Sequence, residues 1–383
     1  MASKTVLLAL MNLEVGGAET HTALLASHLR DLGYRALVAS SGGIYEEFLA
    51  ARGIKHYRLP LDKTGCASLY RSVRLLRRLV RDEDVSLIHA HARIPAFAAS
   101  IAAATTGVKM LTTAHAVFET GFPKGLLSRW GEMTIAVSED IKRHLINAFG
   151  VSEKNIVLIP NGIDLELFRP GLPGSAELRA AYAGEEAGVG DKLIILYVSR
   201  LDQPLSAVAI NLIQACGDLI SSLPVKLLIA GDGAFFGAVA EEAQKVNAAA
   251  GTVVAELLGA RTDINQLLDA TDLAVGVSRV AMEAMACGKN LILAGGEGYG
   301  GLITETGLNE LESDNFTGRQ RHKLATAEDF QQAIKTFAAL PETTKTQRGQ
   351  AFRQHITERH SSLQMAQATT RVYEKIITAR VTP

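Results

Sequence analysis

The segment from Leu273 to Ile303 constrains the fold more than any other part of the chain. It opens with an apolar run, Leu273–Val277, passes through a turn into a short helical pattern that closes at Gly288, and then enters a second apolar run, Asn290–Ala294. Two apolar strands joined by a short helix are typical of a parallel sheet. Open α/β sheets bind ligands at the carboxyl ends of their strands. The segment therefore predicts a parallel sheet with a ligand site at one edge.

Glu283 stands in the helix of this segment, close to the edge where a ligand would bind. The helix begins near Ser278, and its first N–H groups, together with the positive end of its dipole, suit a diphosphate. A carboxylate beside them can accept two hydrogen bonds from a ribose diol. For Glu283 seen in isolation, a solvated helix glutamate is the alternative interpretation.

Apolar strands alternate with helical patterns along most of the chain, which indicates doubly wound parallel sheets. In the first half we expect strands near 5–11, 35–40, 54–59, 85–90, 109–114, 132–137 and 155–159. The periodicity fades between Asn161 and Asp191, a stretch dense in Gly and Pro, and a second alternation begins at Lys192. Because 383 residues with 48% hydrophobic content can bury two cores, we predict two domains.

Composition excludes several classes of protein. The 39 basic and 40 acidic residues give a net charge of −1, which argues against nucleic acid as a partner. The cysteines Cys66, Cys216 and Cys287 have no paired metal-binding spacing and favour a reduced, cytoplasmic protein. The Ala-rich segment 96–104 is far shorter than the ~20 residues that a membrane span needs. No small-residue cleavage site follows the short apolar run near the N-terminus.

Two glycine-containing loops follow expected strands and open expected helices. Gly16 and Gly17 would let the backbone approach a phosphate without a Cβ clash, with an ordinary tight turn as the alternative. Gly231 and Gly233 begin the pattern G-x-G-x-x-x-G, which resembles a dinucleotide fingerprint and raises an NAD-dependent oxidoreductase as another function. Against that function, the pattern follows the second strand of its domain, and Glu256 falls inside a strand rather than at its end.

The sequences of these segments resemble those of the retaining glycosyltransferases of family 4, which have the GT-B fold. Their signature is matched by EAMACGK at 283–289, followed by an apolar strand. Further segments agree in the order of that family: GGAE (16–19), IHAHARIPAF (88–97), TTAH (112–115), AVSE (136–139), IPNGID (159–164), YVSRL (197–201), IAGDG (229–233) and ATDLAV (270–275). The resemblance extends from about residue 4 to about residue 305.

The resemblance implies a GT-B architecture, in which two Rossmann-like, doubly wound parallel-sheet domains face a cleft. We expect these domains at 1–165 and 192–360, a connection at 166–191, and a C-terminal helical segment at 361–383 that packs back on the first domain. The implied reaction moves a sugar from a UDP- or GDP-linked donor to a glycan, lipid-linked or small-molecule acceptor, with retention at the anomeric carbon. The nucleotide sugar is a substrate, and neither a cofactor nor a metal ion is expected.

Eight residues near the expected strand ends are our candidates for donor binding: Gly16, Gly17, Arg200, Gly231, Gly233, Ser278, Arg279 and Glu283. The resemblance places Glu283 on the ribose, the first glycines at the diphosphate and His115 beside the sugar. Arg200 follows a strand, stays charged, and can bind a diphosphate in a bidentate way. His115 and Arg200 are therefore the catalytic candidates.

Two positions depart from the family pattern. Leu205 stands where the pattern has a lysine, so one cation for the leaving diphosphate is missing, and Val275 stands where a glutamate would face the donor sugar. Arg279 could supply the missing cation, although a helix dipole disfavours a cation at that end. These departures leave open a non-catalytic nucleotide-sugar binder or scaffold.

Three further features have a structural interpretation and a functional one. His89 and His91 share a strand face, but the sequence indicates no third metal ligand, and we expect packing and hydrogen bonds. Asp82–Asp84 matches the D-x-D motif of another glycosyltransferase fold, yet it stands where a basic helix ends, and we expect a solvated turn. That helix, 69–81, suits either a solvated face or peripheral contact with the inner face of the membrane.

Overall fold

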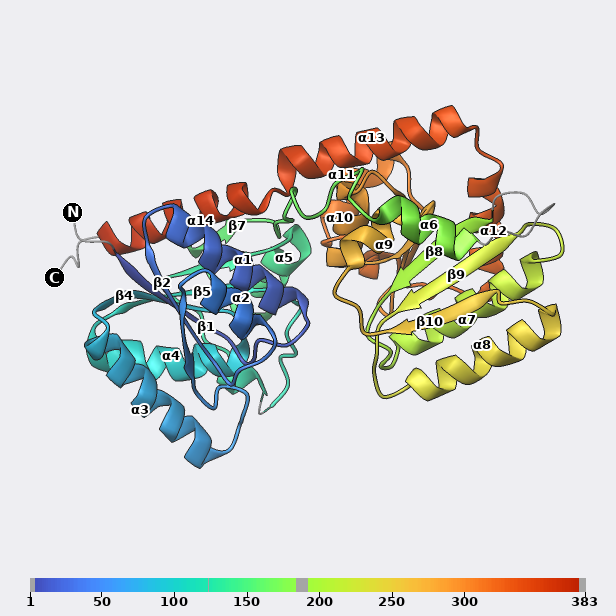
Figure 1. Ribbon diagram of the computed structural model, residues 1–383. Coiled ribbons are helices and arrows are strands. Elements are labelled where there is room, and N and C mark those ends of the chain that lie inside the picture. The colour runs from blue at the N-terminus through green and yellow to red at the C-terminus, as the bar shows by residue number, and fades with distance from the viewer. Residues whose placement is uncertain (1–3, 123, 184–191, 379–383) are drawn as a thin grey trace. The chain divides into compact units, whose positions relative to one another are not determined.

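The computed structural model describes residues 4–122, 124–183 and 192–378, which form two compact units. Unit 1 comprises Met1–Gly162 with Ser361–Pro383, and unit 2 comprises Ile163–His360. Each unit contains one largely parallel sheet with helices on both faces (Figure 1). The expectation of doubly wound α/β domains is therefore confirmed.

The sheet of unit 1 has the strand order β3-β2-β1-β4-β5-β6-β7, and every neighbouring pair is parallel. Its strands are β1 (Thr5–Ala9), β2 (Arg35–Ser40), β3 (Lys55–Arg58), β4 (Val85–Ala90), β5 (Lys109–Ala114), β6 (Met133–Ala136) and β7 (Ile156–Leu158). Its helices are α1 (Gly17–Asp31), α2 (Tyr45–Ala51), α3 (Cys66–Asp82), α4 (Arg93–Thr106), α5 (Glu139–Phe149) and α14 (Ser362–Thr378). Because β2 and β4 flank β1, the strand order reverses at β1, and such a switch point favours a ligand site.

The central strand β1 supplies side chains to both faces of the sheet. Val6 and Leu8 pack in a core cluster with α1, α2 and α14, whereas Leu7 and Ala9 pack in a second cluster with α3 and α4. All four side chains are fully buried. Successive residues of a strand point to opposite faces, so a strand buried on both sides reads as a continuous apolar run.

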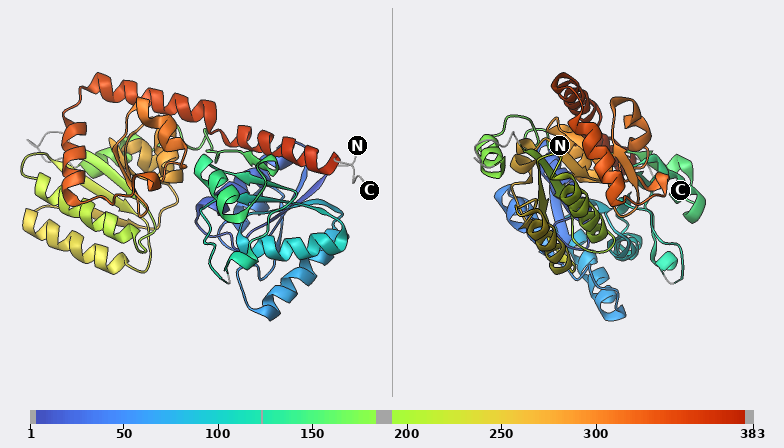
Figure 2. Two further views of the ribbon diagram at one scale, coloured as in Figure 1. Left: turned by 180° about the vertical axis from the view of Figure 1, so that it is seen from behind. Right: turned by 90° about the vertical axis from the view of Figure 1, so that its right-hand side faces the viewer.

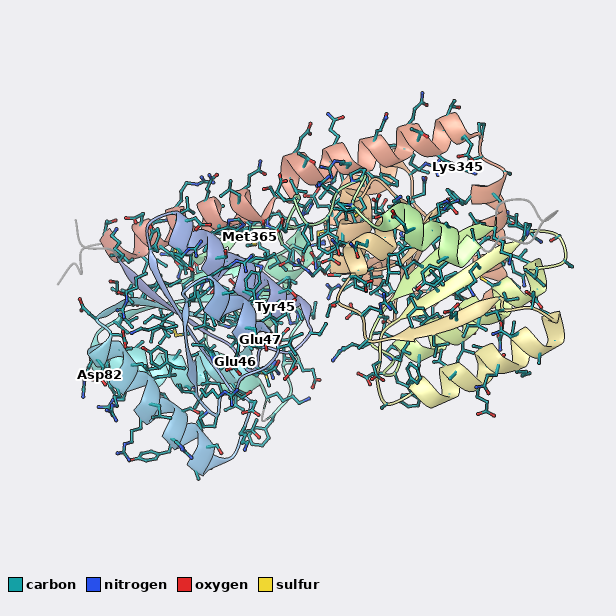
Figure 3. All side chains as sticks on the ribbon, viewed as in Figure 1. Tyr45, Glu46, Glu47, Asp82, Lys345 and Met365 are labelled. Atoms are coloured by element: carbon teal, nitrogen blue, oxygen red, sulfur yellow. The ribbon has the colours of Figure 1, made fainter. Side chains whose placement is uncertain are left out.

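The C-terminal helix α14 packs on unit 1. Met365 and Tyr373 belong to the core cluster shared with α1 and β1 (Figure 3 labels Met365). The hydroxyl of Tyr373 lies 2.7 Å from His89 Nδ1 on β4. Residues 379–383 of the expected C-terminal segment lie outside the described residues.

The sheet of unit 2 has the strand order β10-β9-β8-β11-β12-β13 and is parallel except for β13, which pairs antiparallel with β12. Its strands are β8 (Leu193–Val198), β9 (Val225–Ala230), β10 (Ala255–Gly259), β11 (Leu273–Gly276), β12 (Asn290–Ala294) and β13 (Tyr299–Leu302). Its helices are α6 (Ser175–Ala183), α7 (Leu205–Leu219), α8 (Phe236–Ala250), α9 (Ile264–Ala270), α10 (Ser278–Ala286), α11 (Leu308–Glu312), α12 (Ala327–Ala338) and α13 (Glu342–Arg359). The expected parallel sheet thus has an additional antiparallel edge strand. This strand was not predicted from the sequence, because its two central glycines are unfavourable in strands.

Strand β8 repeats the two-sided burial in unit 2. Ile195 and Tyr197 pack with α7, α8 and α12, whereas Ile194 and Leu196 pack with α9, α10 and α13. Figure 2 shows the same layering from behind. Helix α10, which carries the predicted ribose-binding glutamate, is therefore held on one face of a fully packed sheet.

The segment 166–191, expected to be a connection, contributes a helix to unit 2. Helix α6 packs against α9, and Arg179 on α6 forms an ion pair with Asp272 at 2.8 Å. Residues 184–191 lie outside the described residues. The Gly- and Pro-rich flanks of this short helix masked its periodicity.

Candidate functional site

The carboxyl edge of the unit 2 sheet gathers the predicted donor residues of that unit. In the sheet, β8 lies between β9 and β11, so the loops after these three parallel strands meet at one edge. Arg200 follows β8, Gly231 and Gly233 follow β9, and α10, with Ser278 and Glu283, follows β11. Strand ends read from the sequence were therefore sufficient to bring these residues together.

Glu283 is nearly buried and forms an ion pair on its own helix. Arg279 Nε donates to Glu283 Oε1 at 2.7 Å, and the two side chains are only 15% and 10% exposed. Burial raises the pKa of Glu283, while the charge and hydrogen bond of Arg279 oppose that rise. Removal of Glu283 alone should therefore destabilise the fold, because its buried carboxylate partners a buried guanidinium.

The N-terminus of α10 is held by a loop that the sequence analysis missed. The N–H of Ser278 donates to the carbonyl of Phe316 at 2.7 Å, and its Oγ accepts from Asn315 Nδ2 at 2.8 Å. All three residues have positive φ, between 52° and 59°. The only advance signal was Asn315, since asparagine is enriched in this conformation. One N–H at the start of α10 is thus already occupied by protein.

Gly231 and Gly233 allow the loops after β8 and β9 to touch. A Cβ on Gly231, whose φ is +148°, would lie 1.8 Å from the carbonyl oxygen of Ser199. A Cβ on Gly233 would lie 2.7 Å from the carbonyl carbon of Leu201. The two glycines therefore have a packing role that needs no ligand contact.

The acidic residue that a dinucleotide site would need is not available to this loop. Glu256 lies within β10, and Lys226 Nζ donates to its carboxylate at 2.6 Å. A carboxylate that binds a ribose stands at the end of a strand. An NAD-dependent oxidoreductase is therefore not favoured.

Arg200 presents a cation at the same edge. Its side chain is 72% exposed, and its Nη1 lies 4.0 Å from Asp202 Oδ2, which leaves it accessible to an anion. Leu205 opens α7, and its carbonyl accepts from the hydroxyl of Tyr197 at 3.1 Å. Val275 is fully buried within β11, so this position cannot present a side chain to a ligand.

Gly16 and Gly17 lie where α1 begins in unit 1. The carbonyl of Gly16 accepts from Thr20 N at 3.0 Å and Thr20 Oγ1 at 2.8 Å, which closes the first turn. A Cβ on Gly16 would lie 2.2 Å from Glu19 Oε2, whereas a Cβ on Gly17 would meet nothing within 4 Å. Because Glu19 Oε2 is the end of a flexible side chain that can move aside, packing requires glycine at neither position.

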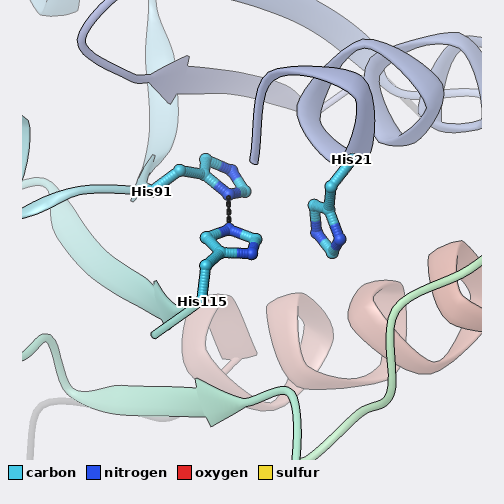
Figure 4. A group of neighbouring side chains, drawn as sticks. All are labelled: His21, His91 and His115. Atoms are coloured by element: carbon cyan, nitrogen blue, oxygen red, sulfur yellow. Dashed lines mark hydrogen bonds between the residues drawn. The ribbon is translucent and has the colours of Figure 1, made fainter. Parts of the chain in front are cut away.

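His115 belongs to a cluster of histidines in unit 1 (Figure 4). It follows β5, and its Nε2 lies 3.2 Å from Nδ1 of His91, which follows β4. The ring of His21, on α1, meets the His115 ring edge-on at a centroid distance of 4.7 Å. Burial, reinforced by the neighbouring histidines, holds the pKa of His91 and His115 well below the usual value. No third metal ligand was expected beside His89 and His91, but the structure brings His21 and His115 close to His91.

The D-x-D motif at Asp82–Asp84 lies at the end of α3. Asp82 is exposed and pairs with Arg78 at 3.0 Å (Figure 3). The carboxylate of Glu83 accepts hydrogen bonds from Arg35 and Tyr57. These contacts agree with a surface turn rather than a metal–nucleotide site.

Helix α3 presents one apolar face to the core, through Val73, Leu76 and Val80, and arginines to the surface. Within the described residues, no helix has the length and apolar character needed to cross a bilayer.

Two family models match consecutive parts of the chain. Glycosyltransferase Family 4 matches residues 15–167, and Glycosyl transferases group 1 matches residues 192–334. Among curated proteins, the chain is 26% identical over 340 residues to the putative glycosyltransferase EpsF of Bacillus subtilis, covering 81% of this chain and 85% of EpsF. It is 25% identical over 246 residues to the phosphatidylinositol N-acetylglucosaminyltransferase GPI3 subunit of Saccharomyces cerevisiae, covering 58% of this chain and 51% of that subunit.

Solved structures share the fold over nearly the whole chain. A glycosyltransferase from Rickettsia africae has a TM-score of 0.78 at 20% identity, covering 99% of this chain and 100% of that one. Anabaena HepE in complex with UDP-glucose has a TM-score of 0.73 at 22% identity, covering 97% and 99%. WaaG, a glycosyltransferase involved in lipopolysaccharide biosynthesis, has a TM-score of 0.68 at 13% identity, covering 98% and 100%.

Proposed function

We propose that this chain, which belongs to the GT-B glycosyltransferases, transfers a sugar from a UDP- or GDP-linked donor to an acceptor hydroxyl, with retention at the anomeric carbon and without a metal cofactor. The observation that carries this proposal is the convergence of Arg200, the N-terminus of α10 and the Arg279–Glu283 pair at the carboxyl edge of one parallel sheet.

Charge on the leaving diphosphate is the main demand of the reaction. It grows as the bond to the anomeric carbon breaks, so groups that bind it most strongly in the transition state accelerate the step. Arg200 supplies an exposed cation, and the start of α10 supplies a helix dipole. Arg279 has five N–H donors, and the Nε donor is bound to Glu283. Its Nη donors give it the means to replace the cation that Leu205 cannot provide.

Glu283 has the chemistry to bind the ribose. One of its oxygens accepts from Arg279, and the second can accept from a ribose hydroxyl. Arg279 opposes the rise in pKa that burial causes, and so favours the ionised form that accepts hydrogen bonds. In this role Arg279 both orients the carboxylate of Glu283 and keeps it ionised.

In unit 1, His115 and Gly17 have chemistry that suits a nucleotide sugar. His115 has a pKa held low by burial and is therefore a neutral imidazole that can exchange hydrogen bonds with a sugar hydroxyl. Gly17 leaves open space at the start of α1, where backbone N–H groups can approach a phosphate.

The donor and the acceptor are proposed as classes. HepE is described in complex with UDP-glucose, which supports a UDP-linked donor here, with a GDP-linked donor as the alternative. The GPI3 subunit is named for a phosphatidylinositol acceptor, and WaaG for lipopolysaccharide biosynthesis. We therefore propose a lipid-linked acceptor first, with a glycan or a small molecule as alternatives.

A cytoplasmic location with peripheral membrane contact fits a lipid-linked acceptor. The exposed arginines of α3, among them Arg71, Arg74 and Arg78, would lie against anionic headgroups at the inner face of the membrane.

The test is a thermal-shift screen of nucleotide sugars followed by a transfer assay. A ligand at 100 times its dissociation constant adds about 2.7 kcal/mol of apparent stability, which readily identifies the donor. The identified donor is then incubated with candidate acceptors and with water alone. We expect release of the nucleoside diphosphate in both, faster with an acceptor. A chain that binds the donor but never cleaves it would be a nucleotide-sugar scaffold instead.

A further inference from the structure

Three histidines from separate elements of unit 1 lie together: His21 on α1, His91 after β4 and His115 after β5 (Figure 4). One nitrogen from each lies within 4.8 Å of the other two. Within the cluster, His91 Nδ1 and His115 Nε2 are 3.2 Å apart. Two nitrogens bound to one zinc ion at about 2.0–2.1 Å in tetrahedral geometry are about 3.3 Å apart. This pair therefore already has the spacing of two ligands on one ion.

Hydrogen bonding alone does not account for the cluster. His91 is 2% exposed, and its Nε2 has no hydrogen-bond partner among the described residues. The neighbouring His89 differs, because Tyr373 and Thr113 each bond one of its nitrogens at 2.7 Å. A purely structural group of histidines would be satisfied as His89 is. With Nδ1 of His91 at ligand spacing from His115, its Nε2 is the protonated nitrogen, and this buried N–H has no acceptor among the described residues, so the hydrogen bonds present leave the cluster incompletely satisfied.

The side chains of the cluster suit a cation. A neutral imidazole has one lone pair for a ligand bond. His21 Nδ1 lies 3.0 Å from Asn161 Oδ1. An amide oxygen only accepts, so Nδ1 carries the proton and the lone pair of His21 is on Nε2. An outer hydrogen bond of this kind commonly orients a metal-binding histidine.

We infer that His21, His91 and His115 form a binding site for a borderline divalent transition-metal ion, of which Zn²⁺ is the representative. Imidazole nitrogens select such ions, whereas Mg²⁺ and Ca²⁺ prefer oxygen ligands. Three protein nitrogens leave a fourth position for water or another ligand.

A second group in the described residues, Glu312 with His355 and His360, also has ligand atoms close together. Its carboxylate is engaged by Arg359 Nη1 at 3.3 Å and by both histidines, at 3.3 and 3.4 Å. This arrangement is that of an ion-pair network, and we use it below as a control.

Occupation of the site has a consequence that rests on the proposed function. The ion would take the nitrogen that His115 offers to the sugar, so zinc should inhibit transfer. Binding itself does not depend on that function, and the two are measured separately.

The binding test uses the full chain without an affinity tag, stripped of metal, and titrated with Zn²⁺ by calorimetry and with Co²⁺ by visible absorption. We expect one ion per chain and the cobalt spectrum of a four-coordinate, nitrogen-bound ion. His91→Gln and the partly exposed His115→Gln should weaken binding by at least about 10–100-fold, and Asn161→Ala by about 10-fold or more. His322→Asn, which removes an exposed imidazole, and His355→Gln should leave it unchanged.

Three outcomes would overturn the inference: no stoichiometric binding, binding unaffected by His91→Gln and His115→Gln, or binding lost in His355→Gln. If the variants at the cluster do not fold, X-ray absorption of the zinc-loaded unmodified chain decides the matter, because fewer than three imidazoles on the metal would contradict the site. If zinc binds as inferred but does not slow transfer, the metal site is confirmed and His115 does not bind the sugar.

Discussion

Arg279 Nε lies 2.7 Å from Glu283 Oε1, one turn along the same helix, and the two side chains are nearly buried. The pair couples two roles that the sequence assigns separately, a cation for the diphosphate and an acceptor for the ribose. A change at either residue should therefore alter both stability and donor binding.

Glu283→Ala should weaken binding of the nucleoside diphosphate by about 1.5–3 kcal/mol, the range for a hydrogen bond to a charged group. It should also lower the free energy of unfolding by up to about 3 kcal/mol, because Arg279 is left buried without its partner. Calorimetric titration with the diphosphate and urea unfolding measure the two effects. Removing both side chains should restore part of the stability but none of the affinity. Unchanged affinity in Glu283→Ala would show that the ribose lies elsewhere.

Gly17→Ala and Gly231→Ala separate ligand contact from packing. Alanine at 17 meets open space and should keep or raise stability, by about 0.5–1 kcal/mol, while its methyl group hinders a bound phosphate. Alanine at 231 would overlap the Ser199 carbonyl at a positive φ, and should cost about 3 kcal/mol of stability or more. Thermal unfolding and donor titration of each variant provide the check. Normal donor affinity in Gly17→Ala would remove that residue from the site.

The fold was predictable because both sheets are buried on two sides. Runs such as Leu193–Val198 then carry a strong strand signal, and alternation with helices defines the parallel sheet. Helix α6 and strand β13 were not predicted, because glycine and proline weaken the local pattern at both.

The site was predictable only in part. Strand ends gave the positions of Arg200 and Glu283, and the spacing of four residues between Arg279 and Glu283 could have predicted their ion pair. The approach of His21 to His115 could not be predicted from the sequence, because it depends on how α1 packs against the sheet. Likewise, no local pattern connects Phe316 with Ser278.

Glu312 should make unit 2 sensitive to acid. Burial alone would raise its pKa, but hydrogen bonds from His355 and His360 and the charge of Arg359 outweigh burial and hold the pKa below its usual value. The native state then binds fewer protons than the unfolded state, so the stabilisation is complete above about pH 4.3 and is lost as the pH falls further. Urea unfolding between pH 3 and 6 should show this loss, and Glu312→Gln should flatten it. An equally steep curve in the variant would assign the acid sensitivity to other carboxylates.

Transfer should survive chelation. Among the described residues, the groups with metal-ligand spacing are the histidine cluster of unit 1 and the Glu312 network, and neither lies in the loops after β8, β9 and β11. The diphosphate would therefore be neutralised by arginine and helix N–H groups instead of Mg²⁺. Turnover measured in EDTA should equal or exceed that in untreated buffer. Loss of turnover that manganese or magnesium restores would contradict this mechanism.

Arg200 and Leu205 test the missing cation directly. Since Leu205 replaces the lysine of the family pattern, Arg200 carries more of the growing charge, and Arg200→Ala should lower kcat by about 10²–10³ with a smaller effect on KM. The side chain is 72% exposed, so folding should be unaffected and unfolding curves serve as the control. Leu205→Lys, at the first residue of α7, should raise turnover if its side chain reaches the phosphates, while Leu205→Met controls for the change in side-chain shape. An Arg200→Ala enzyme with normal kcat, together with a silent Leu205→Lys, would place the chemistry outside this edge of the sheet and favour the scaffold.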